Sequence, residues 1–110
     1  MLEKSSNPRV VNVSSGLGSF ALFHDRIESR AATVPYAASK AAINMMTVRL
    51  ARLLPHIHIN AADPGQTSTE LSGNQGHSIH AGTDAIVNFA LAGPDGPSGT
   101  YADRTGELPW

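Results

Sequence analysis

The sequence predicts an α/β fold, because segments with the apolar pattern of strands alternate with segments of helical spacing. Residues 9–14, 56–62 and 99–103 have strand character, whereas residues 35–54 and 81–91 carry apolar side chains at helical intervals. The order β-α-β-α-β places the strands parallel in one sheet, joined by right-handed crossovers. We therefore expect a parallel sheet with helices packed on it.

The first strand, residues 9–14, is expected to be buried on both faces, since its β-branched valines are nearly continuous. Gly16 and Gly18 then turn the chain into a loop. The helix at residues 35–54 is apolar over more than half of its circumference, so it must contact more than one neighbour. Its apolar positions are Ala38, Ala41, Ala42, Met45, Met46, Val48, Leu50, Leu53 and Leu54.

The second strand ends at a turn formed by Pro64 and Gly65. The polar residues 66–78 that follow are expected to cover a cleft, because loops beside a rigid sheet commonly carry function. The second helix and the short third strand complete the predicted sheet.

Composition excludes several functional classes. Charged residues make up 15% of the 110 residues, against about 25% in an average globular protein, so more surface than usual is suited to burial. The net charge of −1 gives no electrostatic footprint for nucleic acid or an anionic membrane. The absence of cysteine favours the reducing cytoplasm. Residues 1–8 lack a signal-peptide core, and no apolar run approaches the ~20 residues of a membrane span.

Tyr36 and Lys40 are four residues apart, so they share one face of the predicted helix. An ammonium charge about 6 Å from the phenol favours the phenolate by about 2.8 kcal/mol at an effective dielectric of ~20. A serine hydroxyl at the end of the first strand, from Ser14 or Ser15, can bind a substrate oxygen that gains charge. These groups can move a proton onto or off a carbonyl or alcohol oxygen.

Three runs in the same order, Val10 to Ser15, Tyr36 to Lys40 and Asn60 to Gly65, resemble the catalytic half of the short-chain dehydrogenase/reductases. The resemblance covers nearly the whole chain and is closest to the carbonyl-reductase-like members. It implies that residues 1–110 form the C-terminal half of a Rossmann-type doubly wound parallel sheet, a partial NAD(P)-binding domain. The N-terminal dinucleotide-binding half is missing from this stretch.

The resemblance also implies the roles of individual residues. Ser15, chosen over Ser14 by the family pattern, would orient and polarise the substrate oxygen, and Tyr36 would be the acid/base. Lys40 would favour the phenolate of Tyr36 and hold the nicotinamide ribose. The implied cofactor-binding residues are Tyr36, Lys40, Pro64, Gly65, Thr67 and Thr69.

The implied function is hydride transfer between a nicotinamide cofactor and a small carbonyl or alcohol substrate. NADP is expected over NAD because related carbonyl reductases commonly use it. The helix that carries Tyr36 and Lys40 is the expected contact of a homo-oligomer. No metal, nucleic-acid or membrane partner is implied.

Two departures from the family pattern favour an alternative. The stretch between Ser15 and Tyr36 is longer than in many members, and residues 23–28 look like an inserted loop beside the substrate cleft. The glycine-rich dinucleotide loop, the Asn-Asn-Ala-Gly strand and the active-site asparagine are all expected upstream of Ser15, and nothing resembling them is present. The alternative is a non-catalytic half that binds another chain through the exposed edge of its first strand or through the long helix.

Other motifs have simpler explanations. The run from Gly16 to Ala21 fits a dinucleotide fingerprint, but no second strand follows it at the required distance. His56 with His58, and His77 with His80, form pairs without a third ligand, so no metal site is expected. No Gly-x-Ser-x-Gly elbow supports a hydrolase, and the scarcity of basic residues disfavours a helix-turn-helix module.

Overall fold

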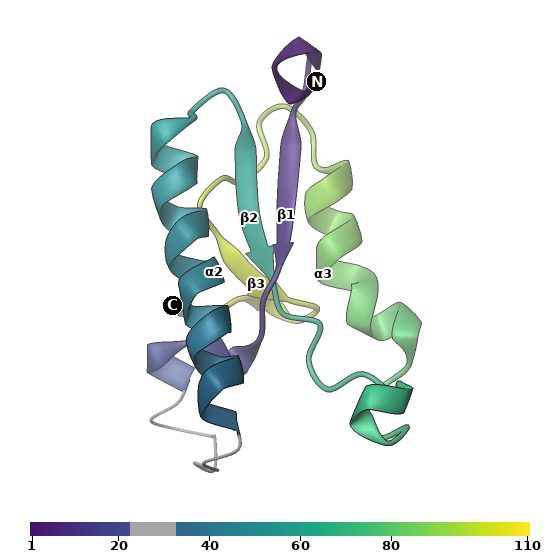
Figure 1. Cartoon of the computed structure of the whole chain (residues 1–110). Helices are drawn as coiled ribbons and strands as arrows, with labels where there is room; N and C mark the ends of the chain where they lie inside the picture. The colour runs from purple at the N-terminus through teal and green to yellow at the C-terminus, as the bar shows by residue number, and fades with distance from the viewer. Residues whose placement is uncertain (23–32) are drawn as a thin grey trace.

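A computed structural model describes residues 1–22 and 33–110, so the predicted inserted loop at residues 23–28 lies outside the described residues. The described chain forms one four-stranded sheet with helices on both faces (Figure 1). The strands, in sheet order, are β1 (Arg9–Val13), β2 (His58–Ala62), β3 (Tyr101–Asp103) and β4 (Gly106–Glu107). The first three strands are parallel, as the sequence predicts, and β4 pairs antiparallel with β3.

The register of the parallel strands aligns their carboxyl ends. Val13 of β1 lies beside Ala62 of β2, and Ala62 lies beside Ala102 of β3. The alignment continues past the strands, because the Ser14 amide donates to the Ala62 carbonyl and the Asp63 amide donates to the Ala102 carbonyl, both at 2.8 Å. Polar residues that follow β1 and β2 are therefore neighbours at one edge of the sheet.

Two long helices cover opposite faces of this sheet (Figure 1). Helix α2 (Val34–Leu53) begins with a proline in its first turn, where a missing N–H costs nothing, and ends just before Pro55. Helix α3 (Ile79–Leu91) starts two residues earlier than predicted, because the Ser78 hydroxyl accepts a hydrogen bond from the Ala81 amide and caps it. The core between α3 and the sheet consists of Ala62, Ala85 and Phe89, with Val11, Ile86 and Ala102 packed against them.

The interior face of α2 differs from the prediction. The buried residues of this helix are Asn44 and Thr47, whereas Met45 and Met46 are 60% and 55% exposed. The Thr47 hydroxyl accepts from the Asn12 side chain at 2.9 Å, and Asn44 accepts from the Ser14 hydroxyl. Because β1 presents polar side chains on this face, hydrogen bonds anchor α2 where an apolar stripe was predicted.

Strand β1 is less buried than predicted. Its residues are half-buried, and Val13 is 44% exposed, since β1 is the outer strand of the described sheet. Two further boundaries differ: His56 lies in a turn before β2, so it does not share a strand face with His58, and the polar segment contains a short 3-10 helix, η4 (Glu70–Ser72). Within the described residues, no helix is both long and apolar enough to cross a membrane.

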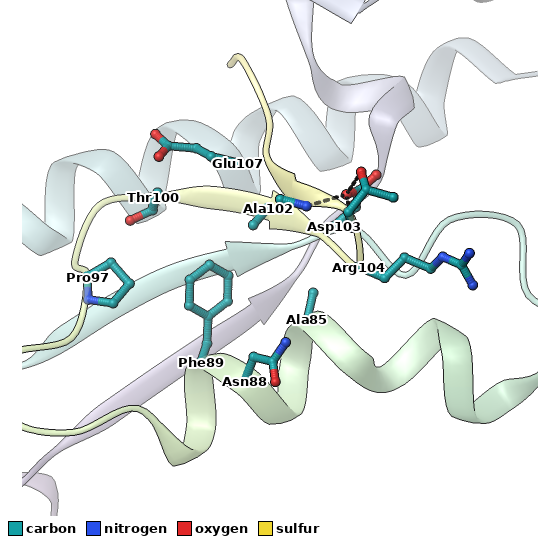
Figure 2. A pocket seen from close by; sticks show the side chains of 11 residues that line it. Ala85, Asn88, Phe89, Pro97, Thr100, Ala102, Asp103, Arg104 and Glu107 are labelled. Carbon is teal, nitrogen blue, oxygen red and sulfur yellow. Dashed lines mark hydrogen bonds between the residues drawn. The ribbon is translucent and has the colours of Figure 1, made fainter.

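The hairpin of β3 and β4 was not predicted. The Asp103 carboxylate accepts from the amides of Thr105 and Gly106, and this closes the turn (Figure 2). Gly106 has φ +140°, which L side chains rarely adopt. The hairpin and α3 flank a cavity of about 360 Å³, separate from the candidate site described below.

Tyr101 is the largest fully buried side chain of the described chain. Its ring stacks on Trp110 with 5.3 Å between the centroids, while its hydroxyl is buried without a well-aligned hydrogen-bond partner. Burial raises the pKa of the Tyr101 phenol well above its usual range, and the nearby carboxylates of Asp63 and Asp103 raise it further.

A raised pKa in the folded state links stability to pH. The contribution of Tyr101 to the free energy of unfolding should be constant below about pH 10, the ordinary pKa of tyrosine. It should be lost as the pH rises above that value. Urea unfolding of the wild type should therefore show a larger loss of stability between about pH 9 and about pH 11 than unfolding of Tyr101→Phe. Equal losses in the two proteins would contradict the assignment.

Candidate active site

A cleft of about 500 Å³ opens at the carboxyl edge of the sheet. It lies between the short 3-10 helix η2 (Gly16–Gly18), the first turn of α2 and the loop after β2. Its lining residues are Ser15, Gly16, Leu17, Tyr36, Asp63, Gly65 and Gln66. The structure thus brings together residues from all three sequence motifs.

The two adjacent serines at the end of β1 have different environments. Ser14 is buried, and its hydroxyl donates to the side chain of Asn44. Ser15 lines the cleft, and its oxygen accepts from the Leu17 amide at 3.3 Å as the cap of η2. This bond uses the Ser15 oxygen as acceptor, so its proton can be donated to a ligand. Of the two serines, Ser15 faces the cleft and Ser14 does not, while the contact of Ser15 with substrate stays a prediction.

Tyr36 and Lys40 lie one turn apart on the same side of α2, as their spacing predicts. Tyr36 is 47% exposed and lines the cleft. The ammonium nitrogen of Lys40 lies 5.5 Å from the centroid of the Tyr36 ring and donates to the Val13 carbonyl at 2.9 Å. The carbonyl at the end of β1 thereby holds a positive charge beside the phenol.

Gly18 sets the distance between η2 and α2. It is buried, and a Cβ on this residue would lie 2.6 Å from the backbone carbon of Lys40. Its carbonyl accepts from the Asn44 amide group at 3.2 Å, so one buried asparagine joins β1, η2 and α2. The absence of a side chain at Gly18 thus allows η2 to pack closely against α2. The sequence signal that was missed is the spacing of Lys40, Asn44 and Thr47, which share a helix face.

The loop after β2 is shaped by a side-chain turn. The Asp63 carboxylate accepts from the Gly65 amide at 2.8 Å, and Gly65 has φ +64°, the left-handed region that favours glycine. A Cβ on Gly65 would also lie 2.7 Å from a ring nitrogen of His77. The sequence does not predict the place of Asp63 in the cleft.

Thr67 and Thr69 have structural partners within the loop. The Thr67 hydroxyl donates to the Pro64 carbonyl at 3.2 Å and packs against Gly82 of α3. Thr69 caps η4, and neither threonine is among the cleft-lining residues. Their contact with a cofactor stays a prediction. No group of three or more potential metal-ligating side chains occurs in the described part of the chain.

Comparison with known proteins identifies the family. The family profile described as short chain dehydrogenase matches residues 1–79. The chain belongs to the short-chain dehydrogenase family. The family predicted from the three motifs, and the partial Rossmann-type fold that goes with it, are confirmed.

Relatives within this family include reductases of plants. Salutaridine reductase from Papaver somniferum is 29% identical over 139 residues, covering 94% of this chain and 45% of the relative. (−)-Isopiperitenone reductase from Mentha piperita is 31% identical, again over 94% of this chain and 45% of the relative. This short-chain dehydrogenase therefore spans about half the length of the curated relatives it matches. Because the alignments are longer than 110 residues, these relatives contain internal residues without counterparts here.

Solved structures show the same fold. The structure of salutaridine reductase from Papaver somniferum has a TM-score of 0.80 at 28% identity, covering 93% of this chain and 47% of that one. The NADPH-bound carbonyl reductase from chicken fatty liver has a TM-score of 0.74 at 23% identity, covering 96% and 44%. At this identity the second likeness supports the fold alone.

The contact between Gly18 and Lys40 predicts a position-specific loss of stability. Gly18→Ala should lower the free energy of unfolding by roughly 1–3 kcal/mol, because the added methyl group overlaps the backbone of α2. The matched control is Gly93→Ala, which meets nothing within 4 Å and should change stability by less than about 0.5 kcal/mol. Urea unfolding of both variants measures the difference, and similar values would refute the packing role of Gly18.

Proposed function

We propose that the chain is the catalytic half of an NAD(P)-dependent carbonyl reductase acting on a small-molecule carbonyl/alcohol pair. The observation that carries this proposal is the shared cleft of Ser15 and Tyr36, with the Lys40 ammonium beside the phenol. The names of the relatives support the reaction class, since they include a (+)-neomenthol dehydrogenase from Capsicum annuum as well as reductases.

Each catalytic residue would act on the substrate oxygen. The Ser15 hydroxyl donates a hydrogen bond to the carbonyl oxygen and polarises it. Tyr36 gives its phenolic proton to that oxygen as negative charge develops on it. The phenolate that remains lies beside the Lys40 ammonium, which stabilises it electrostatically. In the direction of alcohol oxidation the same groups accept the proton.

The residues around the cleft fit the nicotinamide end of a cofactor. Gly16, which bears no side chain, is one of the lining residues, so a flat ring can approach the backbone there. We propose that Tyr36 and Lys40 hold the ribose and that the loop from Pro64 to Thr69 contacts the ring, with contributions from Thr67 and Thr69. When bound, the cofactor would supply or accept the hydride.

NADP is proposed over NAD because solved structures with this fold include NADPH-bound and NADP-bound proteins. The cytoplasm is the proposed compartment because the chain contains no cysteine that could form a disulfide. Residues 1–110 are proposed to be one part of the NAD(P)-binding domain.

A second candidate function is that of a non-catalytic interaction module. The outer edge of β1 has no partner strand among the described residues, and an exposed strand edge can pair with another chain. The exposed methionines of α2, Met45 and Met46, provide an apolar surface on the same side of the sheet as that helix. Whether the chain is a catalytic half or an interaction module, we propose that a homo-oligomer would form through α2.

Cofactor titration separates the two candidates. We expect no saturable NADPH binding by these 110 residues alone, because they include no glycine-rich loop for the cofactor diphosphate. The measurement is nicotinamide fluorescence during titration of the purified chain. Tight, saturable binding would show that this half holds the cofactor unaided and would remove the main support for the non-catalytic candidate.

Substitution of the phenol tests the chemistry. In a longer polypeptide that joins this chain to a dinucleotide-binding half, Tyr36→Phe should lower kcat for carbonyl reduction by roughly 100-fold or more, because the proton donor is lost. NADPH affinity of the same variant should fall by no more than about tenfold, since it loses a single hydrogen bond to the ribose and keeps the other cofactor contacts. Unchanged turnover would defeat the assignment of Tyr36 as the acid.

A further inference from the structure

One negatively charged side chain in the cleft has no role in the proposed chemistry. Asp63 follows β2 directly, and its backbone is fixed by the hydrogen bond from its amide to the Ala102 carbonyl. Its side chain lines the same cleft as Ser15 and Tyr36. The family resemblance assigned no function to this position.

The two oxygens of the Asp63 carboxylate have different environments. Oδ1 accepts from the Gly65 amide at 2.8 Å. Oδ2 points toward Gly16, where an added Cβ would lie 3.1 Å from it. The carboxylate therefore lies between Gly16 and Gly65.

The described residues supply no cation for this carboxylate. Within the described part of the chain, Asp63 forms no ion pair, and the Lys40 ammonium donates a hydrogen bond to the Val13 carbonyl. A half-buried carboxylate attracts a positive charge more strongly than a fully solvated one, because less water screens it.

A buried phenol close to this carboxylate carries no charge either. Tyr101 is fully buried, and its hydroxyl, which has no well-aligned partner, lies close enough to Asp63 for the carboxylate to affect its titration. Because the pKa of this phenol is raised, the phenol is neutral and adds no positive charge beside Asp63. The negative charge is thus available on the cleft side.

We propose that the Asp63 carboxylate makes this cleft selective for an organic cation, held beside the group on which Ser15 and Tyr36 act. The proposal deepens the proposed function and rests on it for the identity of the cleft. Two sources share this chemistry: a substrate that carries an ammonium group near its carbonyl, and the positively charged ring of an oxidised nicotinamide.

Binding measurements on the ¹⁵N-labelled chain test the proposal without turnover. The amide signals of Gly16 and Gly65 are followed during titration with two pairs of ligands that differ in charge. The first pair is 1-methylnicotinamide, a cation, and neutral nicotinamide. The second pair is 1,1-dimethyl-4-oxopiperidinium and its neutral isostere 4,4-dimethylcyclohexanone.

At low salt, at least one cation should bind about tenfold more tightly than its neutral partner, as a charge pair at the edge of a protein allows. Asp63→Asn should reduce this ratio to about one. Asp84→Asn removes an exposed carboxylate of α3 outside the cleft, with the same change in net charge, and should leave the ratio unchanged. Preference for the first pair assigns the cation to the cofactor ring, and preference for the second assigns it to the substrate.

Three outcomes would overturn the proposal: equal affinities within both pairs, a preference that survives in Asp63→Asn, or signals of Gly16 and Gly65 that do not move with any ligand. Should Asp63→Asn fail to fold, titrations of the wild type at increasing salt still test the proposal. The ratio of cation to neutral affinity must decrease as salt screens the charge of Asp63. Absence of carbonyl reductase activity in a longer polypeptide would contradict the proposed function and leave these binding results intact.

Discussion

The contact of η2 with the backbone of α2 is the constraint on which the cleft depends. Gly18 permits it, because any side chain there would overlap Lys40. The Asn44 side chain stabilises this contact, because it accepts a hydrogen bond from the Ser14 hydroxyl and donates one to the Gly18 carbonyl. With η2 held at this distance, Ser15 at its start and Tyr36 at the start of α2 face one cleft. The positions of the Ser15 and Tyr36 hydroxyls are therefore set by packing and by the buried hydrogen bonds of Asn44.

The buried residues of α2 are polar, whereas its methionines are exposed. Hydrogen bonds to Asn12 and Ser14 fix its interior face, so its methionines are left at the surface. The outer edge of β1 also has no partner strand among the described residues. Exposed apolar area and unpaired strand edges favour association with further protein. Both features agree with the length of the chain, which is about half that of its curated relatives.

The sequence predicts most of the elements, because apolar periodicity reflects burial on one or two faces. It also predicts the convergence of Tyr36 and Lys40, which depends only on helical geometry. It does not reveal β4, since a two-residue strand has no periodicity. Nor does it reveal the burial of Asn44 or the orientation of Asp63. Both depend on partners far away in the sequence, Ser14 and Gly16, whose positions arise from the packed structure.

The last residues of the chain connect the sheet to the segment that follows η2. The Pro109 carbonyl accepts from the Ser19 hydroxyl and the Trp110 carbonyl accepts from the Ala21 amide, while the indole stacks on Tyr101. Trp110 is also the single tryptophan of the sequence. Its emission is therefore an intrinsic optical reporter of this corner, and it will respond when the carboxyl terminus detaches or when Tyr101 moves relative to the segment that follows η2.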